Sequence, residues 1–115
     1  MTNEAKTVIR EFLHDLINSV EEMETAADKT LGEIHQKQTW VVLIDVAKHS
    51  LITLKAHADQ WYLSERVIEV ILCSVANICD EIVDVTKHND KFDSIQMPAL
   101  DISIRIRTCY AGPIY

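Results

Sequence analysis

Two short segments of this sequence place an aspartate and a histidine four residues apart, a spacing that suits metal binding. The segment "LIDVAKHS" holds Asp45 and His49, and "IVDVTKHN" holds Asp84 and His88. Residues four apart share one face of a helix, and carboxylate and imidazole groups are ligands for zinc and similar divalent ions. Two such pairs on neighbouring helices would supply four ligands if the pairs faced each other.

The helical positions of the two pairs favour a simpler interpretation. At about 100° per residue, both pairs lie away from the apolar stripes of their own segments. Because the stripes form the core, each pair is expected to point outward and to contribute about 0.2–0.5 kcal/mol as a surface pair. We therefore predict neither a metal nor a cofactor. A site here would need a second subunit that brings the two faces together.

Glu11 and His14 form a Glu-x-x-His motif, the spacing that di-iron helical bundles use. Such bundles need a second copy of the motif and two further carboxylates that point inward. This sequence has no second copy, and both residues fall outside the apolar stripe of their segment. We interpret them as surface residues.

Glu81 and Asp84, within "DEIVDV", resemble half of the Glu-x-x-Asp signature of the all-α nucleotide pyrophosphohydrolases. That resemblance implies a metal-dependent enzyme in which carboxylates hold magnesium against a diphosphate. The family has a further carboxylate cluster on a preceding helix, for which the candidates here are Glu21, Glu22 and Glu24, or Glu65 and Glu69. The first group lies far upstream and the second shares a helix with Glu81, so neither reproduces the family arrangement. Such an enzyme stays an alternative.

A line of polar residues on the first predicted helix is the strongest candidate for a binding surface. Glu11, Asp15, Asn18 and Glu22 follow one outer face, with Glu21, Glu24 and Asp28 beside them. The simpler interpretation is that these residues only face solvent. The functional one is a docking surface for a basic protein, whose approach the negative field would steer. Small acidic inhibitors, immunity proteins and antitoxins are built in this way.

Composition narrows the classes of partner and of fold. The chain has 115 residues, of which 48% are hydrophobic, with two glycines, two prolines and a net charge of −7. So few turn-forming residues favour long helices over an all-β fold. The negative charge argues against nucleic acid or an anionic membrane as partner. The longest apolar run, "WVVLI", is far shorter than a membrane span.

The three cysteines are interpreted as reduced thiols of a cytoplasmic protein, because two of them fit a helix core. Cys73 and Cys79 fall on the same predicted helix, where they cannot easily bridge each other. Small thiols of this kind are common in protein interiors. Cys109 lies near the C-terminus, and its environment cannot be inferred from the pattern.

Apolar residues at helical spacing predict three long helices within a single domain, 1–115, at about 3–28, 31–58 and 64–88. Thr30 and Glu33 match a capping box that would begin the second helix. That helix contains "TWVVLIDV", which propensity alone would assign to a strand. It is apolar almost all round because of Val41, Val42, Leu43 and Val46, which predicts a central helix. Ser64 is the expected N-cap of the third helix.

The C-terminal segment, about 91–110, is predicted to be extended. Pro98 suggests a break, and "DISIRIR" alternates apolar and polar residues, with Ile102, Ile104 and Ile106 on one side. Period two is typical of a strand with one buried face. An unpaired strand needs a partner, which would be "KFDSIQM" in a hairpin, the same strand of a second subunit, or another protein.

Together these patterns predict a mainly α fold, a bundle of three long amphipathic helices with a short C-terminal β-strand or hairpin. The expected function is that of an acidic, cytoplasmic protein-binding module, inhibitor-like or antitoxin-like, with Glu11, Asp15, Glu22, Ile102, Ile104 and Ile106 as partner-binding residues. Coiled-coil spacing and the lone strand also predict a homo-oligomer, and a purely structural oligomer is a further alternative. Nothing in the sequence beyond the resemblance above argues for an enzyme.

Overall fold

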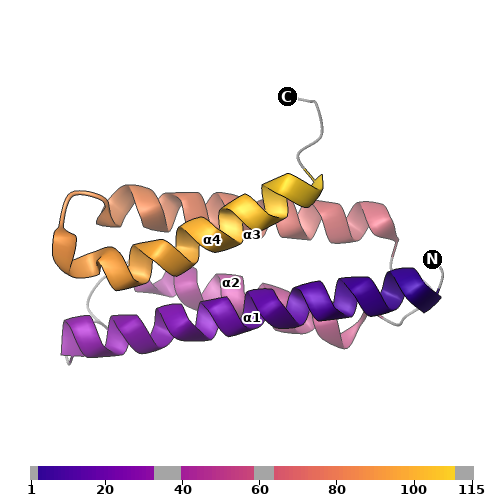
Figure 1. Cartoon of the computed structure of the whole chain (residues 1–115), viewed down its shortest axis with the longest axis horizontal. Helices are drawn as coiled ribbons and strands as arrows, with labels where there is room; N and C mark the ends of the chain where they lie inside the picture. The colour runs from indigo at the N-terminus through magenta and orange to yellow at the C-terminus, as the bar shows by residue number, and fades with distance from the viewer. Residues whose placement is uncertain (1–2, 33–39, 59–63, 111–115) are drawn as a thin grey trace.

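The computed structural model describes residues 3–32, 40–58 and 64–110, and these residues form four α-helices. They are α1 (Asn3–Leu31), α2 (Val41–Ala56), α3 (Glu65–Thr86) and α4 (Asp93–Tyr110), with a short 3-10 helix, η2 (Asp90–Phe92), before α4. Consecutive helices run in opposite directions (Figure 1). The described residues contain no β-strand, so the fold is an all-α four-helix bundle rather than the predicted three helices with a strand.

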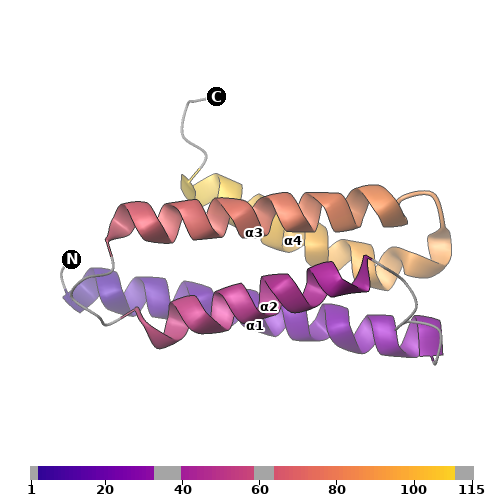
Figure 2. The same cartoon turned by 180° about the vertical axis from the view of Figure 1, so that it is seen from behind.

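Each helix of the bundle packs against two others. α1 and α3 each contact both α2 and α4, which leaves every helix with one outward face. Figure 1 shows α1 and α4 nearest the viewer, and Figure 2 shows α2 and α3 from the opposite side. This up-and-down arrangement is the common one for bundles with short connections.

The apolar stripes expected on the first three helices form the core. Their buried members are Leu13, Leu16, Val20, Met23 and Ala27 of α1, Ile44, Ala47, Leu51 and Leu54 of α2, and Ile68, Leu72, Val75, Cys79 and Ile82 of α3. Full burial of a large apolar side chain contributes about 1.5–3 kcal/mol. The helical period was therefore the correct interpretation of "TWVVLIDV", because burial on one side of the segment outweighs its β propensity.

Two details of the second predicted helix were wrong. Thr30 belongs to α1, so it does not cap a new helix, and Glu33 lies outside the described residues. Nor is α2 a central helix, because Val42 and Val46 are 59% and 44% exposed. A bundle of four helices has no central member, and the extra apolar residues of α2 therefore lie on its outer face.

The ends of α3 follow the predicted signals. The hydroxyl of Ser64 accepts a hydrogen bond from the backbone N–H of Val67 at 3.2 Å, which confirms the N-cap. The helix ends at Thr86. In the turn that follows, the side chain of Asn89 accepts from the backbone N–H of Lys91 at 3.2 Å and starts η2. This tight connection returns the chain antiparallel to α3.

The prediction of an extended C-terminal segment was wrong, since residues 93–110 form the helix α4. Ile102 and Ile106 are fully buried, whereas Ile104 is 56% exposed. The alternation in "DISIRIR" hides a longer helical pattern, because Ile95, Ala99, Ile102 and Ile106 follow one another at 4-3-4 spacing and are all buried. This stripe covers the side of the core that α1, α2 and α3 would leave open.

Pro98 lies inside α4 and does not end it. A proline has no backbone N–H, so residue 98 cannot donate to the carbonyl of Ser94, and its ring crowds the preceding turn. The burial of the α4 stripe outweighs this local cost, which is about 3 kcal/mol for a proline in a helix interior.

Replacing the proline tests the helix directly. We expect Pro98→Ala to raise the free energy of unfolding by up to about 3 kcal/mol, measured by urea denaturation. Thr108→Ala, also on α4, serves as a control for the gain from helix propensity alone, expected at about 0.5 kcal/mol. A hairpin with Pro98 in its turn would instead lose stability in the Pro98→Ala variant.

A polar network fixes the position of α4 against α3. The carboxylate of Asp80 accepts hydrogen bonds from the hydroxyl of Ser103 and from the guanidinium of Arg107. Arg107 also donates to the side-chain oxygen of Asn77 at 2.9 Å. Ser103 is only 3% exposed, so its hydroxyl depends on a partner within the protein.

We expect Asp80→Ala to lower the free energy of unfolding by about 1–3 kcal/mol, because it leaves the buried Ser103 hydroxyl without its acceptor. Ser103→Ala in the same chain should recover part of the loss. The comparison is a double-mutant cycle by chemical denaturation. Strictly additive losses would mean that the two side chains do not stabilise each other.

Candidate functional site

The outward face of α1 carries the residues predicted to bind a partner. The core stripe of α1 points Leu13, Leu16 and Val20 inward, so residues on the opposite side of the helix must meet solvent. Glu11, Asp15, Asn18 and Glu22 are all exposed, and we refer to these four residues as the acidic face. Within the described residues, none of its three carboxylates forms an ion pair.

The N-terminal half of the acidic face borders a hollow of about 370 Å³ between α1 and α2. Its lining residues are Arg10, Glu11, His14, Asp15 and Lys55. The ammonium of Lys55 lies 3.1 Å from Nδ1 of His14. Because lysine can only donate, Nδ1 is the acceptor in this contact. Lys55 thus ties the end of α2 to α1 and leaves Glu11 and Asp15 facing the hollow.

The C-terminal half of the acidic face borders a second hollow, of about 480 Å³, between α1 and the start of α4. It is lined by Asn18, Glu21, Glu22, Thr25, Ala26 and Lys29 of α1 and by Ser94 and Pro98 of α4. Asn18 and Glu22 therefore stand at its edge in the same way that Glu11 and Asp15 stand at the first. A segment lying along α1 would find a recess on either side of the helix.

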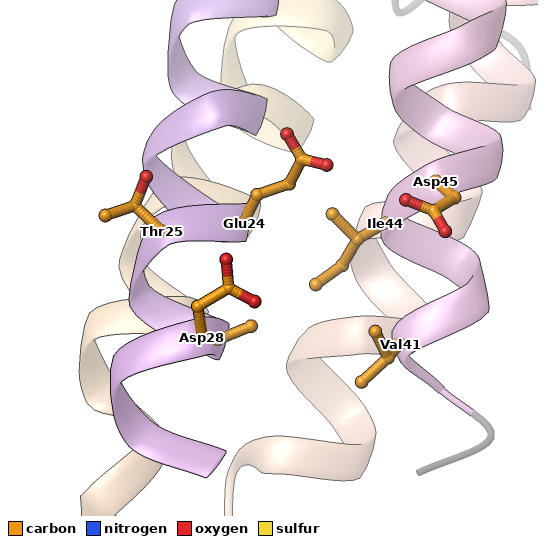
Figure 3. A pocket seen from close by; sticks show the side chains of 7 residues that line it. Glu24, Thr25, Asp28, Val41, Ile44 and Asp45 are labelled. Atoms are coloured by element: carbon orange, nitrogen blue, oxygen red, sulfur yellow. The ribbon is translucent and has the colours of Figure 1, made fainter. Parts of the chain in front are cut away.

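A third hollow, of about 220 Å³, lies between the end of α1 and the start of α2. Figure 3 shows Glu24, Thr25 and Asp28 on the α1 wall and Val41, Ile44 and Asp45 on the α2 wall. Glu24 is not free, because it accepts from the ammonium of Lys48 at 2.8 Å. The hollow thus has carboxylates on both walls.

The ion pair beside this hollow has a clear electrostatic signature. The hydrogen bond to Glu24 is the main reason that the pKa of Lys48 is raised, and the negative charges of Glu24, Glu21 and Asp45 add to it. Burial opposes these effects. Lys48 therefore stays charged and cancels one of the carboxylates, so the field of the third hollow is weaker than its residue types suggest.

The pairs that suggested metal binding are exposed and separate. Nδ1 of His49 lies 2.7 Å from the backbone carbonyl oxygen of Asp45, not from its carboxylate. Asp84 accepts from Lys87 at 2.7 Å, and this hydrogen bond is the main cause that lowers the pKa of Asp84. His88 follows the end of α3 and is exposed. The described residues contain no group of three or more His, Cys, Asp or Glu that could hold a metal ion.

The carboxylates of the nucleotide pyrophosphohydrolase alternative do not gather. Glu81 and Glu65 are exposed, and Glu69 pairs at 3.5 Å with Arg66 on the same helix. Glu21 and Glu22 line the hollow between α1 and α4, whereas Glu24 pairs with Lys48. Within the part of the chain that the structure describes, these carboxylates thus do not form a cluster that could hold a metal ion.

The three cysteines are free and lie in three environments, with Cys79 buried, Cys73 half-buried and Cys109 exposed. Burial raises the pKa of the Cys79 thiol from 9.0 to about 12, and the charge of Asp80 adds to the effect. Cys79 is therefore a neutral core residue at ordinary pH, as its position in the α3 stripe indicates.

The raised pKa predicts a loss of stability in alkali. The unfolded thiol loses its proton above pH 9, whereas the folded one keeps it to about pH 12. The free energy of unfolding should therefore fall as pH rises through this range, by at most about 1.4 kcal/mol per pH unit from this group. Denaturation of the native chain and of Cys79→Ala between pH 8 and 11 measures it. The two curves should converge, and parallel curves would contradict the assignment.

Sequence reasoning found the acidic face but not the hollows beside it, which depend on how α2 and α4 lie against α1. Of the three isoleucines predicted to bind a partner, Ile102 and Ile106 contact the chain's own core and only Ile104 faces solvent. The 4-3-4 spacing from Ile95 to Ile106 is the sequence signal that distinguishes the buried Ile102 and Ile106 from the exposed Ile104. No described helix is long and apolar enough to cross a membrane.

Comparisons with models of protein families, with curated proteins and with solved structures found no match for this chain. The fold class and the candidate site therefore stand on the geometry described above.

Proposed function

We propose that this chain is a protein-binding module that docks a basic helical segment of a partner along the acidic face of α1. The observation that carries the proposal is the row of exposed carboxylates, Glu11, Asp15 and Glu22, that have no ion partner within the described residues. α1 as a whole has seven acidic and three basic residues, and so a net charge of −4. Such a surface attracts cationic proteins and raises their rate of association.

The spacing of the acidic face supports a helical partner. Glu11, Asp15, Asn18 and Glu22 repeat at intervals of four, three and four residues. A partner helix with lysine or arginine at the same intervals would place one cation against each carboxylate along a single seam. The aliphatic stems of these long side chains can lie in the hollows on either side of α1 while their charged ends reach the carboxylates.

Docking of this kind would inhibit a partner that needs its basic surface for its own function. A basic surface that binds nucleic acid or another anion would be covered when it engages the acidic face. The module needs no catalytic group to act in this way, since occupation of the basic surface is sufficient.

The test uses a synthetic amphipathic peptide with lysine and arginine at 4-3-4 spacing, and a peptide of the same composition with the spacing scrambled. The binding variant is Glu11→Gln with Asp15→Asn and Glu22→Gln. Each exposed charge pair contributes about 0.2–1 kcal/mol, so the triple variant should bind the patterned peptide about 3- to 150-fold more weakly. Fluorescence anisotropy at low and at high salt measures the dissociation constants.

A matched control removes the same charge from other surfaces. Glu65→Gln with Glu81→Gln and Asp90→Asn changes three exposed carboxylates outside α1 and should alter binding by less than threefold. Equal weakening by the two triple variants would show that only net charge matters, and would overturn the proposal. Equal binding of the patterned and scrambled peptides would do the same.

A further inference from the structure

A second candidate surface lies on the outward face of α4. Met97, Leu100 and Ile104 are 63%, 39% and 56% exposed, and they lie opposite the buried stripe of the same helix. We refer to these three residues as the α4 ridge. Their spacing of three and four residues draws a single apolar line along the helix. In Figure 1, α4 is at the front of the bundle and no other helix covers it.

Charged residues extend the α4 ridge at both ends with opposite sign. Asp93 lies four residues before Met97, and Arg107 lies three residues after Ile104. Asp93 is exposed. The contacts of Arg107 with Asp80 and Asn77 both use its Nη2 atom, so Nε and Nη1 can still donate. Along the helix, the order is therefore one acidic residue, three apolar residues and one basic residue.

This order of residues is self-complementary when the helix is reversed. If α4 is packed antiparallel against a second α4 with Leu100 at the centre, Leu100 meets Leu100, Met97 meets Ile104, and Asp93 meets Arg107. A two-fold axis produces each of these contacts twice. The 4-3-4-3 spacing from Asp93 to Arg107 is also the spacing at which two helices keep contact along their length.

The charge of the bundle favours a second copy at α4 over one at α1 or α3. α1 and α3 each carry a net charge of −4, whereas α4 has two aspartates and two arginines and no net charge. Two copies of an acidic chain repel each other least where their facing surfaces are neutral. The face of α2 with Val42 and Val46 is apolar too, but its sequence does not end in opposite charges.

We propose that two copies of this chain associate through their α4 ridges, antiparallel and about a two-fold axis at Leu100. None of the three residues of the α4 ridge lines the hollows beside the acidic face, so the inference does not depend on the function proposed for α1. A dimer formed in this way would present two acidic faces to a partner.

Disulfide trapping tests the axis itself. In a chain with Cys73→Ser and Cys109→Ser, Leu100→Cys should form a covalent dimer rapidly under mild oxidation, because the axis brings the two copies of residue 100 together. Met97→Cys and Ile104→Cys should each cross-link slowly alone and rapidly when mixed. Val46→Cys, on the exposed face of α2, is the control and should cross-link slowly. Chains with tags of different length, separated without reductant, identify the mixed product.

Sedimentation of the unmodified chain and of Leu100→Glu completes the test. The native chain is expected to sediment as a dimer at tens of micromolar, and Leu100→Glu as a monomer with the same helix content by circular dichroism. A native monomer at that concentration would overturn the proposal. So would a Leu100→Glu variant that stays dimeric, or a Val46→Cys chain that cross-links as fast as Leu100→Cys.

Discussion

Burial of one apolar stripe from each of four helices is the interaction on which the rest of this structure depends. One neighbouring helix is not enough to bury a stripe completely. Each stripe is covered by the two helices that its own helix contacts. α4 closes the arrangement by placing Ile95, Ala99, Ile102 and Ile106 against α1 and α3. That requirement is strong enough to keep Pro98 inside a helix. It also determines which residues of every helix face outward, and so which residues are available for binding.

The outward faces differ in character because the charges are unevenly distributed among the helices. α1 and α3 each carry a net charge of −4, α4 carries none and α2 carries +1. Lys48 and Lys55 of α2 both turn toward α1, where they contact Glu24 and His14. Within the described residues, Glu11, Asp15 and Glu22 of α1 keep uncompensated carboxylates. α2, α3 and α4 each expose several large apolar side chains, whereas the described part of α1 exposes Val8. The uncompensated carboxylates of α1 thus lie on the helix that, among the described residues, exposes the fewest large apolar side chains.

Few polar groups enter the core of the described part of the chain, and each that does has a hydrogen-bond partner within the protein. Thr86 donates to the carbonyl of Ile82 at 2.7 Å, and Ser103 donates to Asp80. Every buried side-chain nitrogen or oxygen in the described part of the chain has a hydrogen-bond partner. The Cys79 thiol stays neutral because burial raises its pKa. The interior thus has the composition of a structural core, which leaves binding to the surface.

The sequence by itself determined the first three helices, their inward stripes and the outward direction of Glu11, Asp15 and Glu22, because a 3.6-residue period over many turns admits one helical face. It could not determine α4. Alternation over seven residues indicates a strand, whereas the 4-3-4 spacing from Ile95 to Ile106 indicates a helix. The need to cover the core selected the helix. The hollows beside α1, the Asp80 network and the exposure of Met97, Leu100 and Ile104 follow from how the helices pack. They join residues far apart in the chain, and no local period records such contacts.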